Sequence, residues 1–177
     1  MLAGKLPDVN KNVTGGIPAS LDDQIVGVDH VAIAVSDIEQ AISWYRSALG
    51  FVLSEKRTTA GDHSAMVSAV MRAGGATVVL VQGLSANSQV SRFIDQYGAG
   101  VHHVAFAVKD LDAALARVAG AGWPDTPVIH VGGVRQVYLR RDEATGVRVE
   151  LIEAGNGSFS DAGVEQLYRA MEENNLY

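Results

Sequence analysis

Two histidines stand at the same place in two copies of a short repeat, and this arrangement suits a metal site. Residues 29–38 recur as residues 102–111, so that His30 matches His103. An internal repeat duplicates one supersecondary unit, and equivalent residues of the two units meet near the pseudo-two-fold axis that relates them. Imidazole nitrogen is a common metal ligand. The repeat therefore predicts that the two histidines converge and that two halves of the chain form one metal cup.

Glu150 is the predicted third ligand. It stands between Val149 and Leu151, so in a strand its carboxylate points to the face opposite to these two apolar residues. A buried carboxylate without a partner is energetically costly, and a metal ion would be that partner. The chain contains no cysteine, which leaves imidazole and carboxylate as the strong ligands. His102 is predicted to point away from His103, as a surface or helix-packing residue.

The elements that must position these side chains follow from the periodicity of apolar residues. Alternation over residues 27–35 predicts a strand, and Ser36 and Asp37 offer a cap for a helix that Gly50 ends. Further strands are predicted over residues 51–56, 64–72 and 76–82. The second half repeats this order, with a strand over 102–108, a helix over 110–119, and strands over 128–131, 134–140 and 147–153.

The predicted fold class is α+β, with two paired βαβββ modules that form a curved mixed sheet cup. The predicted boundaries are a flexible N-terminal arm (1–26), a first module (27–87), a linking helix and loop (88–100), a second module (101–154) and a C-terminal helix (155–177).

Composition limits the partners of the chain. A length of 177 residues with 47% hydrophobic residues is enough for a full core. The formal charge of -6 and the scattered Lys and Arg residues argue against nucleic-acid binding. No apolar run is long enough for a signal peptide or a membrane span, so we expect a cytoplasmic protein without membrane contact.

Three segments resemble the motifs of the vicinal oxygen chelate superfamily. They are residues 29–35 with the helix that follows, residues 100–106 and residues 147–152, and the resemblance covers about residues 27–154. This superfamily contains glyoxalases, methylmalonyl-CoA epimerases, extradiol and 4-hydroxyphenylpyruvate dioxygenases, and fosfomycin or bleomycin resistance proteins. The chain is most similar to the methylmalonyl-CoA epimerases and the hydroxyphenylpyruvate dioxygenases. The resemblance implies the paired-module fold and a metal cup, and leaves the reaction open.

The chain departs from the family pattern in the last strand of its first module. Epimerases and glyoxalases of the family place a Gln or Glu ligand there, whereas alignment of the two modules puts Val79 opposite Glu150. Gln82 points to the other face, and we expect it to be a polar residue at the strand end. His30, His103 and Glu150 then form a two-His-one-carboxylate facial triad, which leaves coordination positions for substrate, water or oxygen.

Such a site stabilises the enolate that forms when a proton leaves the carbon beside a carbonyl. The resemblance aligns residues 61–64 with the segment that carries a catalytic Glu in methylmalonyl-CoA epimerases. Asp62 matches the Glu, but His63 has the better unperturbed pKa for proton transfer and is the first choice. His130 is a candidate second base. The alternatives are a solvated hairpin loop for Asp62 and His63, and a rim or hydrogen-bonded role for His130.

The sequence thus predicts a metal-dependent epimerase that acts beside a carbonyl. The favoured substrate is a small keto-sugar or keto-cyclitol similar to 2-epi-5-epi-valiolone, with methylmalonyl-CoA next. The alternatives are a non-heme Fe(II) dioxygenase of the hydroxyphenylpyruvate or extradiol type and a drug-binding resistance protein. We expect a divalent ion (Zn, Mn, Co, Ni or Fe), a small-molecule carbonyl substrate and a homodimer, and the sequence leaves open whether modules pair within or between chains.

Overall fold

The computed structural model describes residues 20–119, 124–131, 133–154 and 168–169, which contain one sheet of eight strands. The strand order across the sheet is β2-β3-β4-β1-β5-β8-β7-β6. The strands are β1 (Ile25–Ala34), β2 (Val52–Ala60), β3 (Ala65–Ala73), β4 (Ala76–Gly83), β5 (Gly100–Val108), β6 (Ile129–Val131), β7 (Val134–Tyr138) and β8 (Arg148–Ala154). The helices are α1 (Ile38–Leu49), α2 (Gln89–Tyr97) and α3 (Leu111–Val118).

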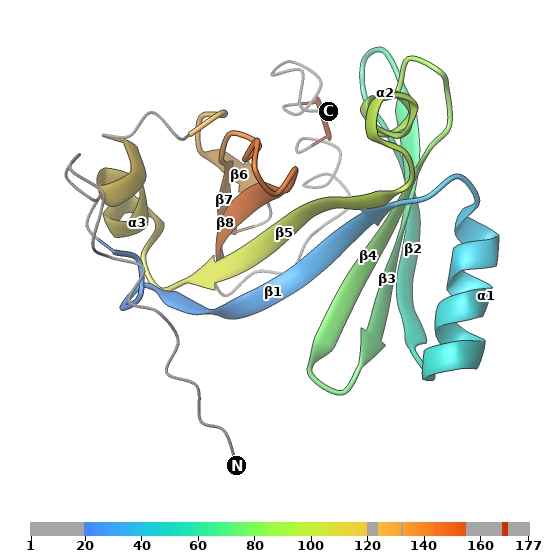
Figure 1. The fold of residues 1–177 in the computed structure, drawn as a ribbon, viewed down its shortest axis with the longest axis horizontal. Coiled ribbons are helices and arrows are strands. Elements are labelled where there is room, and N and C mark those ends of the chain that lie inside the picture. The colour runs from blue at the N-terminus through green and yellow to red at the C-terminus, as the bar shows by residue number, and fades with distance from the viewer. Residues whose placement is uncertain (1–19, 120–123, 132, 155–167, 170–177) are drawn as a thin grey trace.

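Two βαβββ modules lie side by side within this one chain. Figure 1 shows β1 and β5 crossing the middle of the molecule together, with α1 and β2–β4 at one end and α3 and β6–β8 at the other. β1 and β5 pair antiparallel, while β1 pairs with β4 and β5 with β8 in parallel. The predicted fold class is therefore confirmed, and the modules pair within the chain.

The register of the strands confirms the alignment of the two modules. In the first module Ala32 lies opposite Val79, and in the second Ala105 lies opposite Glu150. Since Ala32 and Ala105 are equivalent in the repeat, Val79 and Glu150 occupy equivalent places in the sheet.

The helices of the modules begin in the same way. The side chain of Asp37 accepts a hydrogen bond from the Gln40 amide at the start of α1, and Asp110 accepts one from the Ala113 amide at the start of α3. These bonds satisfy amide groups that have no partner within the helix. Gly50 ends α1 with a φ of 71°, a conformation that glycine adopts without strain.

The sheet has an outer face that carries α1 and α3 and an inner face that carries polar residues beside apolar ones such as Met66 and Val81. On the outer face, apolar residues of α1 pack on β3 and β4, and those of α3 pack on β7 and β8. On the inner face, Ala32 and Ala105 are fully buried and leave room for larger neighbours. Burial of the outer apolar side chains supplies the main driving force for folding.

The chain enters the fold earlier than predicted. β1 starts at Ile25, inside the range predicted for the N-terminal arm, and residues just before it are bonded to the second module. Arg117 of α3 bonds the Ser20 carbonyl and the Asp23 carboxylate, and Lys109 bonds the Asp23 carbonyl. Residues 1–19 and most of the predicted C-terminal helix lie outside the described residues.

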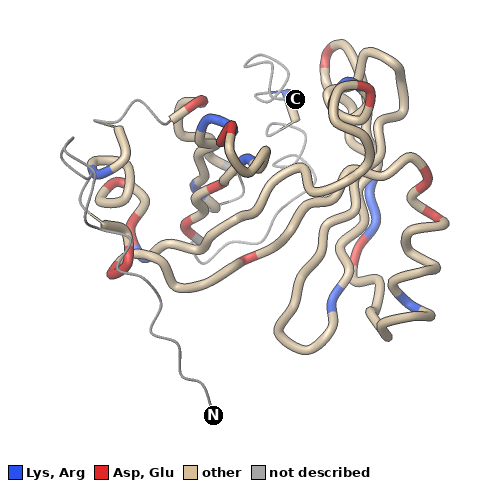
Figure 2. The backbone as a smooth tube through the Cα atoms, in the orientation of Figure 1, with Lys and Arg blue, Asp and Glu red and all other residues tan. Residues whose placement is uncertain are grey.

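The charged residues of the described chain are spread over both modules (Figure 2). Several Arg side chains lie beside carboxylates: Arg117 pairs with Asp23, Arg135 with Asp112 and Glu153, and Arg148 with Asp125. Within the described residues, no helix has the length and hydropathy that a membrane span requires.

Candidate metal centre

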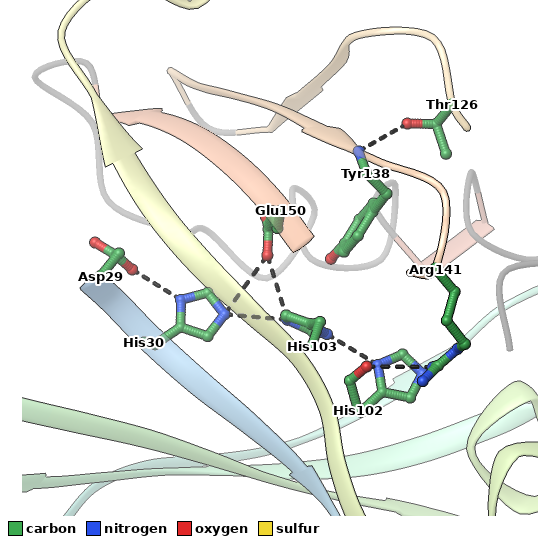
Figure 3. Close-up of polar contacts among 8 residues, drawn as sticks. All are labelled: Asp29, His30, His102, His103, Thr126, Tyr138, Arg141 and Glu150. Atoms are coloured by element: carbon green, nitrogen blue, oxygen red, sulfur yellow. Dashed lines mark hydrogen bonds and ion pairs between the residues drawn. The ribbon is translucent and has the colours of Figure 1, made fainter. Parts of the chain in front are cut away.

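His30, His103 and Glu150 come together on the inner face of the sheet (Figure 3). They project from β1, β5 and β8, three neighbouring strands, and one ligand atom from each lies within 4.8 Å of the others. His30 Nε2 lies 3.2 Å from His103 Nε2, and Glu150 Oε2 lies 3.6 Å and 3.2 Å from these two nitrogens. The structure therefore brings the three predicted ligands to one point.

The chemistry of this point fits a cation. Glu150 is 1% exposed, and within the described ranges no residue donates a hydrogen bond to its Oε2 atom, although two imidazole nitrogens lie close to it. A buried carboxylate oxygen without a donor is costly unless another positive partner satisfies it. Two imidazoles and one carboxylate are a donor set that several first-row divalent ions accept. The residues present therefore fit a divalent metal ion.

Neighbouring groups hold the first histidine and shift its pKa. His30 Nδ1 bonds Asp29 Oδ1 at 2.8 Å, which leaves Nε2 to face the other two ligands. Burial lowers the pKa of His30, but the hydrogen bond that its ring donates to Asp29 and the charges of Glu150 and Asp29 outweigh it, so the net pKa is raised. The same hydrogen bond with His30 lowers the pKa of Asp29.

Burial dominates at the second histidine. Desolvation lowers the pKa of His103, and Glu150 only partly opposes this effect. Tyr138 lies beside Glu150 on the neighbouring strand, with its ring edge-on to His103 at 5.4 Å between centroids. Burial and the charge of Glu150 raise the pKa of Tyr138 well above its usual value, so this phenol remains protonated. The second module thus places a neutral imidazole and a neutral phenol beside the carboxylate.

His102 lies beside His103, which contradicts the prediction that it points away. The two rings approach with 2.9 Å between their Nδ1 atoms, and His102 is 2% exposed. The reason is a bulge in β5, because the pairing with β1 passes from His103 to Val101 and leaves His102 without a partner. The helix-packing alternative is confirmed, since the His102 ring lies 4.9 Å from that of Phe93 in α2.

Burial also explains the protonation state of His102. Desolvation lowers its pKa well below the usual value, and the nearby His103, Arg141 and Arg148 add to the shift. Arg141 donates a hydrogen bond to the His102 carbonyl. Its guanidinium group also lies over the rings of Phe93 and Tyr97. His102 is therefore a neutral, fixed imidazole.

Gln82 has the strand-end role predicted for it. Its Oε1 atom accepts a hydrogen bond from the Ile38 amide at the start of α1, at 2.9 Å. Glu153 takes the matching place in the second module, where it accepts from the Leu111 amide at the start of α3. Gln82 is therefore engaged on the outer face, away from Glu150.

The predicted acid and base residues lie apart from the three ligands. Asp62 and His63 lie in the turn between β2 and β3 and are exposed. Asp62 pairs with Arg169 at 3.5 Å, and the His63 carbonyl accepts a hydrogen bond from the Asn87 side chain. His130 is exposed and lies opposite Arg135 in the β6–β7 pairing. The Arg135 side chain bonds Asp112 of α3 on the outer face. His130 thus faces away from Glu150.

Sequence reasoning did not assign roles to Asp29, Gln136 or Arg148. Gln136 is fully buried two residues before Tyr138, and no residue in the described part of the chain bonds either polar atom of its amide. Arg148 is 5% exposed and pairs with Asp125. Asp29 is part of the repeated segment, but its hydrogen bond with His30 depends on the local backbone conformation, which the sequence did not indicate. For Gln136 and Arg148, the sequence offered only the alternation of side chains along the strands, which places them on the same face as Glu150.

Comparison with known proteins identifies the class. The sequence profile of the Glyoxalase/Bleomycin resistance protein/Dioxygenase superfamily matches residues 27–151, and the chain belongs to this superfamily. It is 31% identical over 132 residues to the ethylmalonyl-CoA/methylmalonyl-CoA epimerase of Cereibacter sphaeroides, covering 70% of this chain and 95% of that protein. It is 32% identical over 131 residues to the mitochondrial methylmalonyl-CoA epimerase of Mus musculus, covering 72% of each.

A solved structure leads to the same group. The methylmalonyl-CoA epimerase of Mycobacterium tuberculosis superimposes with a TM-score of 0.62 and 30% identity, over 74% of this chain and 89% of that protein. The fold and the class thus agree.

Proposed function

We propose that this protein is a metal-dependent epimerase that acts at a carbon beside a carbonyl, through an enolate. The observation that carries the proposal is the group of His30, His103 and Glu150, which has a valine in place of a fourth protein ligand. Similarity to named epimerases over most of their length supports the reaction class.

The three ligand side chains would hold the ion, with two neutral imidazole nitrogens and one carboxylate oxygen. When bound, a divalent ion polarises the carbonyl and stabilises the negative charge that develops on its oxygen. Asp29 keeps His30 oriented, and Tyr138 packs against His103 beside the carboxylate. The buried inner face excludes water from these side chains, which strengthens their electrostatic effects.

Asp62 and His63 are the proposed proton-transfer groups. Ser64, in the same turn, bonds the hydroxyl of Tyr168 at 2.8 Å, and the ring of Tyr168 is buried on the inner face with Met66 and Val81. The turn therefore borders the inner face. His130, on the outer face, is not included in this assignment.

A small polyhydroxy ketone is the proposed substrate. The inner face near Glu150 carries the Gln136 amide, with a donor and an acceptor that no described residue satisfies. Substrate hydroxyl groups both donate and accept and would satisfy both atoms, whereas the ionised carboxylate of a methylmalonyl group only accepts and would leave the amide oxygen unpaired. Methylmalonyl-CoA, which the names of the relatives specify, is the second candidate. An Fe(II) dioxygenase is the runner-up reaction, because the same open positions suit dioxygen.

One experiment separates these reactions. Metal-reconstituted protein is incubated with a keto-cyclitol or with methylmalonyl-CoA in D₂O while dissolved oxygen is recorded. We expect solvent deuterium at the epimerised carbon and no oxygen uptake. Oxygen consumption with ferrous iron would instead establish the dioxygenase, and exchange with methylmalonyl-CoA alone would replace the proposed substrate.

Variants test the site directly. Replacing His30, His103 or Glu150 with Ala removes one of three ligands, so we expect metal binding and exchange to be lost. His130→Ala is the control, because His130 lies on the outer face. Full metal occupancy in all three ligand variants would refute the site.

A further inference from the structure

Each module contains a one-residue bulge directly before its histidine ligand. Val28 of β1 pairs with Phe106 of β5, and the next pair is His30 with Ala105. Asp29 is therefore the extra residue of β1. The partners of Ala32 and Ile33 are His103 and Val101, so His102 is the extra residue of β5. Bulges re-aim the side chain of the extra residue. The repeat has therefore duplicated the bulge as well as the ligand.

The extra residue makes the same contact in both modules. Asp29 Oδ1 lies 2.8 Å from Nδ1 of His30, and His102 Nδ1 lies 2.9 Å from Nδ1 of His103. In both histidines the other nitrogen, Nε2, faces Glu150. The two ligands are thus held in the same way by the residue that precedes each of them.

A contact between two ring nitrogens holds one proton, so one ring donates and the other accepts. A metal ligand must offer a nitrogen without a proton. If Nε2 of His103 binds the ion, its neutral ring carries the proton on Nδ1 and donates it to His102. His102 must then accept at Nδ1 and carry its own proton on Nε2.

We propose that His102 is the positioning residue of the second half-site, which fixes His103 in the metal-binding tautomer as Asp29 does for His30. The proposal depends on the metal site proposed above. Hydrogen-bond acceptors behind a ligating histidine fix its tautomer and ring orientation. The two half-sites then differ in one respect, because a carboxylate supports His30 and a neutral imidazole supports His103.

The surroundings of His102 suit this role. Its Nε2 atom is buried and has no hydrogen-bond partner among the described residues, so none of them competes with His103 in determining its tautomer. Phe93 lies against the ring, and Arg141 holds the His102 carbonyl. These contacts hold the ring in place, and among the described residues only His103 bonds one of its nitrogens.

The test compares three variants of the full chain. His102→Leu removes the acceptor, His102→Asn retains a side-chain acceptor, and Phe93→Leu alters the packing against the ring without changing a hydrogen bond. Zinc and cobalt affinities are measured by competition with a chromophoric chelator, and thermal unfolding of the metal-free proteins monitors folding. We expect about 10- to 100-fold weaker binding for His102→Leu, and binding within about threefold of the parent for the other two.

Nitrogen NMR of the zinc-loaded parent reads the tautomers directly. We expect the proton on Nδ1 of His103 and on Nε2 of His102. A proton on Nδ1 of His102 would overturn the proposal, and so would equal metal affinities of His102→Leu and Phe93→Leu. Absence of metal binding by the parent would overturn the site itself. If both histidines show the expected tautomers but the protein does not catalyse epimerisation, only the proposed function is overturned.

Discussion

Val79 and Glu150 occupy equivalent places in the two modules, and only Glu150 can bind a metal. Val79 lies opposite Ala32 just as Glu150 lies opposite Ala105. One residue therefore decides whether the site has three or four protein ligands. The number of ligands in turn determines how many positions remain for a substrate.

Val79→Glu should supply a fourth ligand. We expect metal affinity to rise by about tenfold or more, which corresponds to about 1.4 kcal/mol or more, and turnover to fall because a substrate position is lost. Chelator competition and the absorption spectrum of the cobalt protein measure the change. Val79→Leu has no ligand atom and is the control. Unchanged affinity in a folded Val79→Glu protein would show that this position does not reach the ion.

Among the elements, α2 carries the packing of the second half-site. Gly83 ends β4 directly beneath the start of this helix. A Cβ atom there would overlap the hydroxyl oxygens of Ser88 and Ser91 and lie 2.9 Å from the Ser91 amide nitrogen. Phe93, further along α2, contacts His102. The close approach at Gly83 therefore helps to place the helix that supports the site.

Gly83→Ala should displace α2. We expect a loss of about 1–3 kcal/mol in the free energy of unfolding, as for other overpacked sites. Urea denaturation measures the loss. Gly75→Ala is the matched control, because no atom lies within 4 Å of its added Cβ. Equal stability of the two variants would mean that the helix adjusts without cost.

The N-terminal entry into β1 is attached to α3 by a charged pair. The hydrogen bond from Arg117 lowers the pKa of Asp23 from 3.8 to about 2. Because the pKa is depressed in the folded protein, this contact stabilises the fold above pH 3.8 and is lost as the pH falls through about 2. The contact is exposed, so its contribution is small.

At pH 3.8 we expect the Asp23 carboxyl to remain ionised in the parent protein and to be more protonated in Arg117→Gln, which lacks the largest cause of the lowered pKa. Carboxyl carbon chemical shifts in NMR measure both states. Lys109→Gln, which removes a bond to the Asp23 carbonyl, is the control and should leave the carboxyl ionised. Half protonation in the parent would contradict the charged pair.

At the scale of the whole molecule, the proposed metal site spans the two modules. His30 belongs to the first module, and His103 and Glu150 to the second, so an ion held by all three would connect the modules across the β1–β5 junction. A ligand that binds only the folded state raises its stability in proportion to the logarithm of its concentration. Metal binding should therefore stabilise both modules together.

Zinc at 100 times its dissociation constant should raise the free energy of unfolding by about 2.7 kcal/mol. Urea unfolding followed by tryptophan fluorescence and by circular dichroism measures this effect, and we expect one transition by both probes. The increment should vanish in His103→Ala and persist in His130→Ala. A zinc effect confined to one of two separate transitions would show that the modules unfold independently.

The sequence alone determined the elements, the repeat and the three candidate ligands, because hydrophobic periodicity and turn residues are local signals. Thus α1 spans its predicted range, and Val79 lies opposite Ala32 as the alignment requires. The start of β1 was predicted too late, since Ile25 pairs with Val108, which is distant in sequence.

Only the tertiary structure decided the arrangement around the ligands. Strict alternation turned His102 away from His103, whereas the bulge in β5 brings the two rings together. The face occupied by His130 likewise depends on its pairing with Arg135. A bulge reverses the side of the sheet that alternation predicts, and it forms only when two strands from different parts of the chain are paired.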